Sequence, residues 1–297
     1  MKIMNPNRLL PLVAVGVLAL SATACGDDVP DGSSSVASTV AGGTVPSTVA
    51  DDTVPPPGPV IDHPVGAGDL VMRIGYEGGF VPIEYTFLNL PTVLVTGDGR
   101  LIVQGGTPEI YPGPLLPNLL VRSIGEDGVQ HLLALADEYG LLADREYGRP
   151  DNIADAPDTV VTISANGSTF RHSAYALGLA SFDEAESDDA RRQLAGFVDA
   201  VNEWLATSGD ANGGQPYRAD SYLIRATPVT DLSGFDVEPT FVEWFGSADL
   251  TVASECAEVP GSEYGELFAS ANQLTFFTVG EMVYSLTVKP LLPGDSC

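Results

Sequence analysis

The feature that most restricts how this chain can fold is a long stretch, residues 26–68, with almost nothing to pack. It is rich in Ser, Thr, Gly and Pro, contains no aromatic residue and includes the run Val54-Pro55-Pro56-Pro57-Gly58-Pro59. Such a segment cannot bury enough apolar surface to offset the entropy lost on ordering. We therefore predict that residues 25–68 form a disordered tether, and that folding is left to roughly 230 residues from Asp69 onward.

The N-terminus has the parts of a secretory signal. Lys2 and Arg8 precede an apolar run, Leu9 to Leu20, and small residues follow it. A charged start, a short apolar segment and small residues before a cut are typical of a signal peptide. The run is shorter than the roughly 20 residues that a membrane-spanning helix needs. We predict that the folded part is exported.

The residues Ala22-Thr23-Ala24-Cys25 resemble the lipobox of bacterial lipoproteins, although that family most often has Leu where Ala22 stands. The resemblance implies that residues 1–24 are removed as a signal peptide. It also implies that Cys25 carries acyl chains such as palmitate, which would hold the protein on the extracytoplasmic face of the cell membrane. Two or more acyl chains give stable anchoring. Ordinary cleavage after Ala24 stays open as an alternative, and it would release the protein with a free thiol.

The two other cysteines, Cys256 and Cys297, agree with export. An even pair in an exported chain predicts a disulfide, with two free thiols as the alternative. On the chain-entropy model, closing a loop of this length stabilises a fold by roughly 4 kcal/mol. The bond would also fix the last residue of the sequence to the body of the fold.

The formal net charge is −27, from 40 acidic and 13 basic residues. This balance argues against a nucleic-acid partner, because binding to phosphates relies on Lys and Arg. A solvated acidic surface is the simplest interpretation of the charge. A cation-binding or halotolerant surface is the alternative.

Residues 69–208 alternate hairpins with amphipathic helices. A strand is expected at Leu70–Tyr76, followed by a hairpin around Gly97-Asp98-Gly99 and a second hairpin around Asn166-Gly167. Ser123-Ile124-Gly125-Glu126 matches a capping box and predicts that a helix starts there and ends at Gly140. A second helix is expected from about Ser187 to Gly209. This order predicts an α+β fold, with antiparallel sheets built of hairpins and helices packed on one face.

The segment 208–216 is the best internal boundary, and residues 217–297 are expected to form a smaller α+β domain or subdomain closed by the disulfide. Strands are predicted at 221–227 and 249–252, a short helix at 263–271, and a hairpin from 274 to 289. The folded part weakly resembles uncharacterised secreted actinobacterial proteins in its order of elements and in its tail, and this likeness implies no catalytic residues.

Candidate sites are few. The densest acidic cluster suggests a calcium site, since carboxylate oxygens suit calcium, but acids before a helix also favour its N-terminal dipole. Of the three histidines, His63 is expected to be solvated in the tether, His131 to lie on the surface of the first helix, and His172 to lie on the second hairpin. The five calcium candidates are Asp183, Glu184, Glu186, Asp188 and Asp189.

Two groups of aromatic residues are the remaining lead, and we expect them to be core rather than an exposed binding surface. They are Tyr76, Phe80, Tyr85, Phe87 and Tyr111 near the start of the fold, and Phe241, Trp244 and Phe245 near its end. No nucleophile elbow, zinc motif or nucleotide-binding loop is present in the sequence. The pattern favours a membrane-anchored, non-catalytic binding or envelope-structural protein with an envelope protein or cell-wall ligand as partner. A cell-wall-acting or cation-dependent enzyme and a regulatory or inhibitory module for a secreted partner are the alternatives.

Overall fold

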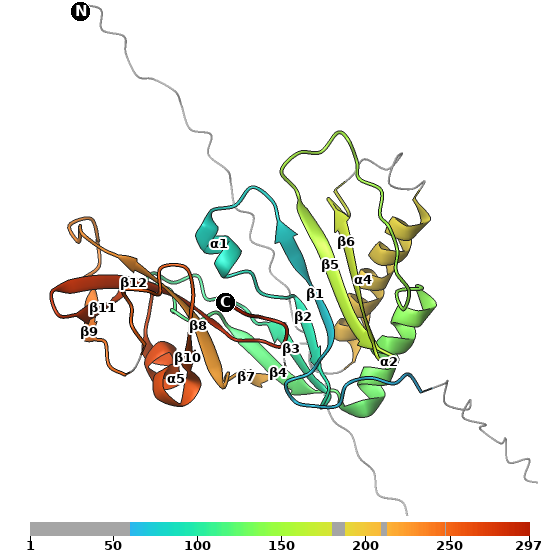
Figure 1. Cartoon of the computed structure of the whole chain (residues 1–297), viewed down its shortest axis with the longest axis horizontal. Helices are drawn as coiled ribbons and strands as arrows, with labels where there is room; N and C mark the ends of the chain where they lie inside the picture. The colour runs from blue at the N-terminus through green and yellow to red at the C-terminus, as the bar shows by residue number, and fades with distance from the viewer. Residues whose placement is uncertain (1–59, 180–187, 209–212, 247) are drawn as a thin grey trace, which may run out of the picture. The chain divides into compact units, whose positions relative to one another are not determined.

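The computed structural model describes residues 60–179, 188–208, 213–246 and 248–297. From Pro55 to the C-terminus the chain forms one compact unit, which contains two sheets and the helices that cover them (Figure 1). The predicted α+β class is confirmed. Cys25, the predicted signal peptide and most of the predicted tether lie outside the described residues.

The first sheet has seven strands in the order β6-β5-β1-β2-β3-β4-β7, and every neighbouring pair is antiparallel. The third strand in this order, β1, is hydrogen-bonded to β5 on one side and to β2 on the other. The strands are β1 (Leu70–Gly78), β2 (Val93–Thr96), β3 (Arg100–Gln104), β4 (Leu119–Ser123), β5 (Pro157–Ala165), β6 (Ser168–Tyr175) and β7 (Gln215–Pro216).

Both predicted hairpins of this sheet are present, β2–β3 and β5–β6. The second turns at Asn166 and Gly167, which have φ angles of 52° and 72°. Two successive residues with positive φ define the two-residue turn whose twist matches that of the flanking strands, and Asn-Gly is the favoured pair for it. The local sequence therefore sets the register of β5 against β6.

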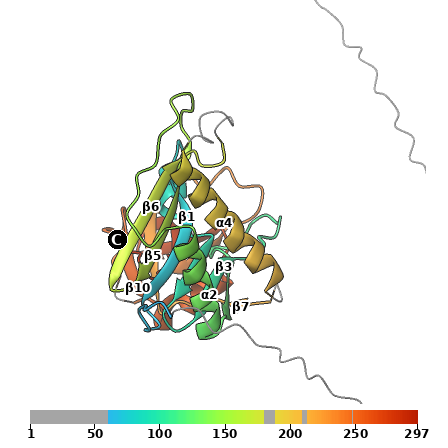
Figure 2. The same cartoon turned by 90° about the vertical axis from the view of Figure 1, so that its right-hand side faces the viewer.

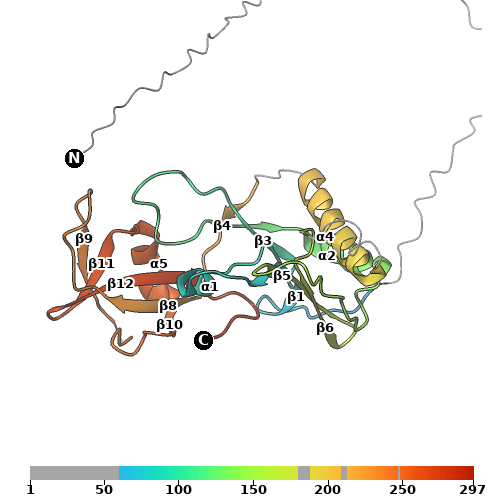
Figure 3. The same cartoon turned by 90° about the horizontal axis from the view of Figure 1, so that it is seen from above.

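Two helices cover one face of the sheet, α2 (Gly125–Glu138) and α4 (Asp189–Thr207). They lie side by side across that face, as Figures 2 and 3 show. Apolar residues at helical spacing face the sheet, and Leu133 of α2 and Phe197 of α4 are fully buried among them. The core between helices and sheet is otherwise almost entirely aliphatic. Gly140 ends α2 with a φ of 69°, a conformation that glycine adopts without strain.

The second sheet has five strands in the order β10-β8-β12-β11-β9, antiparallel except for β9 against β11. The helix α5 (Gly261–Ser270) packs on one face over an aromatic core that includes Tyr264, Phe268 and Phe277. The strands are β8 (Ser221–Pro228), β9 (Thr240–Glu243), β10 (Ala257–Pro260), β11 (Thr275–Val279) and β12 (Met282–Pro290).

The predicted strand at 249–252 is wrong. These residues form a turn, in which the Asp249 carboxylate accepts hydrogen bonds from the backbone N–H and the hydroxyl of Thr251. Aspartate side chains often compete with strand formation in this way. The strands on either side of this turn are β9 and β10, which the sequence analysis did not identify.

The C-terminal tail joins the two sheets. Cys256 and Cys297 form a disulfide, with Cα atoms 5.4 Å apart, so this prediction is confirmed. Asp295 is nearly buried and forms ion pairs with Arg73 of β1 at 2.8 Å and with Lys289 of β12 at 3.3 Å. Leu292 packs into a small apolar cluster with residues of β2, β3 and β4.

The fold begins before Asp69. Ile61 is part of the core, and both its backbone N–H and its carbonyl are hydrogen-bonded to the Gln130 side chain of α2, each at 2.9 Å. Residues 60–68 therefore belong to the folded unit, and the tether boundary predicted at residue 68 lies too late in the chain. One apolar residue within a polar stretch was too weak a signal to reveal this contact.

Candidate binding groove

A groove of about 410 Å³ lies beside the second sheet. Its walls are Leu88, which follows the short helix α1 (Ile83–Phe87), and the loop of residues 105–118 between β3 and β4. Residues 285–288 of β12 form its floor. Figure 3 shows the loop running from β3 and β4 towards α5. This loop is rich in Pro and Gly, and one of its sides lies along the groove.

Backbone hydrogen bonds hold the 105–118 loop in place. At its base, the Gly105 N–H donates to the Asn118 carbonyl at 2.8 Å. At its far end, the Leu115 N–H donates to Ala271 at 3.0 Å, and the Gln273 N–H donates to Gly113 at 2.9 Å. The loop thus starts in the first sheet and is pinned to the chain just before β11, so the groove has a defined wall.

None of the fifteen residues that line the groove is charged, although the chain has 40 acidic residues. Most are aliphatic or proline. The polar ones are Thr107, Asn118, Gln273, Ser285 and Thr287. An uncharged, mainly apolar concavity with a few neutral hydrogen-bonding groups is typical of a ligand site.

Apolar side chains are exposed around the groove. Ile110 and Tyr111 on the loop are 63% and 62% exposed, and Leu88 is 37% exposed. Exposed apolar patches of this kind often mark binding surfaces.

The prediction that the aromatic groups are core is therefore wrong for most of their members. Tyr76, Phe80, Tyr85, Tyr111, Phe241 and Phe245 are exposed, whereas Phe87 and Trp244 are partly buried. Trp244 stacks on Tyr264, with ring centroids 4.6 Å apart. The Phe87 ring lies under the Lys289 ammonium at 5.7 Å. Composition cannot distinguish buried from exposed aromatic residues, because burial depends on which other elements pack against them.

Two hydroxyls on the groove floor have no partner in the described part of the chain. Ser285 and Thr287 are half-buried on β12 and alternate with residues of the aromatic core. Neither side chain makes a hydrogen bond to any described residue. Hydroxyls in such a position favour a ligand that can hydrogen-bond to them.

Two other hollows, of about 230 and 510 Å³, lie against β4, and the smaller one also borders the C-terminal part of α4. Both are bordered by Gly213 and Gly214. These glycines follow directly after residues 209–212, which the structure does not describe. We build no site on them.

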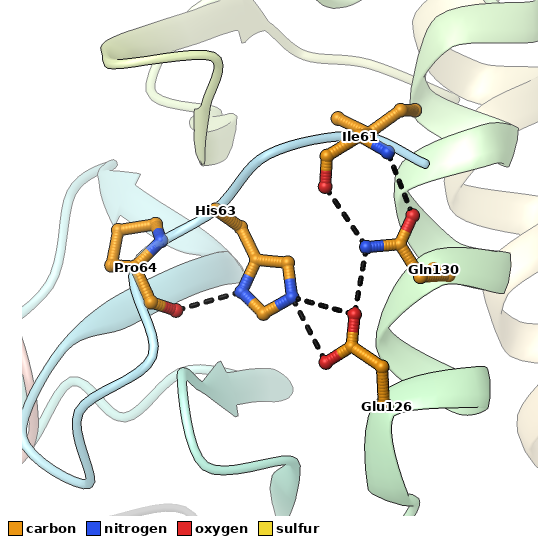
Figure 4. A network of polar contacts seen from close by, with 5 residues as sticks. All are labelled: Ile61, His63, Pro64, Glu126 and Gln130. Carbon is orange, nitrogen blue, oxygen red and sulfur yellow. Dashed lines mark hydrogen bonds and ion pairs between the residues drawn. The ribbon is translucent and has the colours of Figure 1, made fainter. Parts of the chain in front are cut away.

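A polar cluster fixes the start of the fold to α2 (Figure 4). His63 was expected to be solvated, but its side chain is only 4% exposed. Its Nδ1 lies 2.7 Å from the Pro64 carbonyl oxygen, and its Nε2 lies 3.1 Å from Oε1 of Glu126. Each ring nitrogen of His63 therefore has an oxygen partner, one on the backbone and one on α2. Hydrogen bonds from Gln130 and His63 lower the pKa of Glu126.

The capping box predicted at Ser123-Ile124-Gly125-Glu126 is also wrong. Ser123 belongs to β4, the residue before α2 is Ile124, and no side chain caps the helix. Glu126 instead accepts hydrogen bonds from His63 and Gln130. The cluster attaches residues 60–64 to the helix, and we interpret it as a structural junction.

The other two histidines have structural surroundings. His172 is fully buried, with Nδ1 2.7 Å from the Tyr147 hydroxyl and Nε2 2.9 Å from the Leu141 carbonyl oxygen. Burial lowers the pKa of His172 and raises the pKa of Tyr147 to about 12. His131 lies on the surface and stacks on Trp204, with ring centroids 5.4 Å apart. In this part of the structure neither histidine has a carboxylate hydrogen-bond partner.

The calcium hypothesis stays a prediction, because Asp183, Glu184 and Glu186 lie outside the described residues. Asp188 caps α4, accepting from the N–H groups of Ala190 and Arg191, and it also accepts from the N–H of Gly148 at 2.7 Å. Asp189 forms an ion pair with Arg192. Within the described ranges, no three acidic, cysteine or histidine side chains converge on a point where they could hold a metal ion.

Comparison of the chain with protein-family models, with curated proteins and with solved structures finds no match. The described residues include no helix long and apolar enough to cross a membrane. The fold and the groove therefore define the protein only as an α+β protein with an uncharged, apolar surface groove.

Proposed function

We propose that the protein is a membrane-anchored lipoprotein of the cell envelope that binds a partner outside the cytoplasm through the groove beside β12. The anchor rests on the signal sequence and on Cys25, and the proposed site rests on one observation. In a strongly acidic chain, an uncharged groove with exposed apolar side chains at its edge is held open by a hydrogen-bonded loop.

The anchor is tested by replacing Cys25. In the native host, Cys25→Ala is expected to move the protein from the membrane fraction to the medium, because acyl chains supply the membrane affinity. Ser47→Ala, in the same predicted tether, is the matched control and should stay in the membrane fraction. Membrane retention of Cys25→Ala would contradict the proposal.

The groove is tested in cells with a photocrosslinking amino acid. Placed at Ile110, the crosslinker is expected to give a discrete adduct of constant mass. Placed at Val252, which is 71% exposed in the turn before β10, it serves as the control. Equal or absent crosslinking at the two positions would contradict a binding role for the groove.

A further inference from the structure

We propose that the groove binds an extended, uncharged and mainly aliphatic peptide segment that belongs to a basic partner protein. This inference rests on the proposed binding function and specifies the chemistry of the ligand. Three features support it, namely the unpartnered hydroxyls of the floor, the absence of charge in the lining, and the acidity of the rest of the chain.

The floor favours a peptide over a purely apolar ligand such as an acyl chain. An acyl chain would displace water from Ser285 and Thr287 without replacing its hydrogen bonds, and such a loss weakens binding. A peptide backbone offers a donor and an acceptor at nearly every residue. Ser285 and Thr287 lie two residues apart on one strand, and two residues is also the repeat of an extended peptide.

The lining favours aliphatic, uncharged side chains. Leu88, Ile110 and the leucines and prolines of the 105–118 loop offer apolar contact. A charged side chain placed among them would lose its hydration and gain no counter-ion, which is unfavourable. The segment inside the groove is therefore neutral.

The surroundings favour positive charge on either side of that segment. The chain has a net charge of −27, and Glu109, next to Ile110 on the loop, is exposed. A field of this sign attracts basic partners, speeds their association and disfavours acidic ones. Lysine or arginine flanking a neutral aliphatic core is the arrangement that fits both the groove and its surroundings.

The test uses the whole chain from residue 25 as the Cys25→Ala variant, which needs no detergent to compete for the groove. The probes are fluorescein-labelled decapeptide libraries whose six central positions are drawn from Ala, Val, Leu, Ile, Pro and Thr. Two lysines stand on each side of this core in one library, and two glutamates stand on each side in the other. The uncharged fluorophore N-phenyl-1-naphthylamine reports on general apolar binding to the same groove.

We expect the lysine-flanked library to bind at least about tenfold more tightly than the glutamate-flanked one. The difference should shrink in 1 M salt, where the screening length is about 3 Å. Ile110→Asp should abolish binding, and Ser285→Ala with Thr287→Val should weaken it by about tenfold. Val252→Asp is the control of equal charge change and should bind as the parent does. Circular dichroism verifies that each variant is folded.

The outcomes distinguish failure of the peptide proposal from failure of the proposed binding function. If the fluorophore binds and Ile110→Asp removes that binding, but neither library binds, the groove is a site and the peptide proposal is overturned. Tighter binding of the glutamate-flanked library also overturns it. If neither the fluorophore nor the peptides bind, the proposed function fails as well.

Discussion

The two sheets are each covered by helices on one face, yet they are stabilised by different means. The seven-stranded sheet has a cluster of 19 buried residues, almost all aliphatic, under helices of 14 and 19 residues. The five-stranded sheet has 13 buried residues, with large aromatic rings among them, under a helix of 10 residues. Only the smaller core is accompanied by a disulfide.

This difference indicates how a fold with a small core is stabilised. A smaller unit buries a smaller fraction of its surface on folding, so small units often depend on covalent links. Aromatic rings bury more area per residue than aliphatic side chains. The disulfide and the Asp295 ion pairs then fix the tail that joins the second sheet to the first. We expect the two regions to respond differently to perturbation, and the predictions below run from the largest effect to the smallest.

The largest effect is expected from removing the disulfide. Cys256→Ser with Cys297→Ser should lower the free energy of unfolding by about 4 kcal/mol on the chain-entropy model. Hydrogen exchange should accelerate mainly in β8, β11 and β12, and much less in β1 and β5. Reduction of the parent protein is the control and should give the same pattern. Equal acceleration in both sheets would contradict the idea that the disulfide mainly stabilises the five-stranded sheet.

A smaller effect is expected from Asp295→Asn, which removes the negative charge between Arg73 and Lys289. Hydrogen bonds to charged groups contribute about 2 kcal/mol, so the urea midpoint should fall by a corresponding amount. Asp231→Asn, in an exposed turn, should leave the midpoint unchanged. An unaltered midpoint for Asp295→Asn would mean that the tail is held by the disulfide and Leu292 alone.

In the region of the seven-stranded sheet, Asp188→Ala should lower the free energy of unfolding by about 1 kcal/mol, because it removes the N-cap of α4. Burial opposes ionisation of Asp188, but hydrogen bonds from the backbone of Gly148, Arg191 and Ala190 outweigh it and lower its pKa. A lowered pKa stabilises the fold above the ordinary carboxyl value of 3.8, and this contribution is lost as the pH falls through the lowered pKa.

The measurement is urea denaturation of the parent and of Asp188→Ala at a series of pH values. Their difference in stability should be complete at neutral pH and should shrink on acidification below about pH 4. Asp189→Ala, whose carboxylate only pairs with Arg192 on the surface, is the control. A difference between the parent and Asp188→Ala that stays constant down to pH 2 would show that the cap does not depend on the charge.

The smallest effect is expected at the junction. Glu126→Gln should lower the free energy of local opening at the junction by about 0.5 kcal/mol. The effect is small because the carboxylate is largely exposed and such ion pairs contribute little. The change should appear as faster exchange of the Ile61 amide, with no shift of the global unfolding midpoint. Asp127→Asn, on the same turn of α2, should leave the Ile61 amide unaffected.

The sequence predicted the elements that have strong local signals and missed those that depend on distant partners. The Asn166-Gly167 hairpin, the helices that bury Leu133 and Phe197, and the disulfide are all present. Strands β9 and β10 were missed, because β9 is short and mostly exposed and takes its place in the sheet from β11.

The groove was also beyond prediction, for a related reason. It forms where the loop between β3 and β4 meets a strand almost 170 residues later in the chain, and no local pattern encodes that contact. The aromatic residues were noticed, but most of the exposed ones lie outside the strands, in loops and in α1, where the sequence has no periodic pattern that would show their exposure. His63 was assigned to the tether because its partner, Glu126, lies 63 positions away.

The attachment of residues 60–64 has a mechanical consequence. A force applied along the chain from its N-terminal side first meets the hydrogen-bonded pair of Ile61 and Gln130, and only then β1. That strand is bonded to a neighbour on each side, so pulling it out requires two ladders to fail together, whereas an edge strand is peeled away one pair at a time. The chain thus enters its folded unit at a strand suited to bearing load.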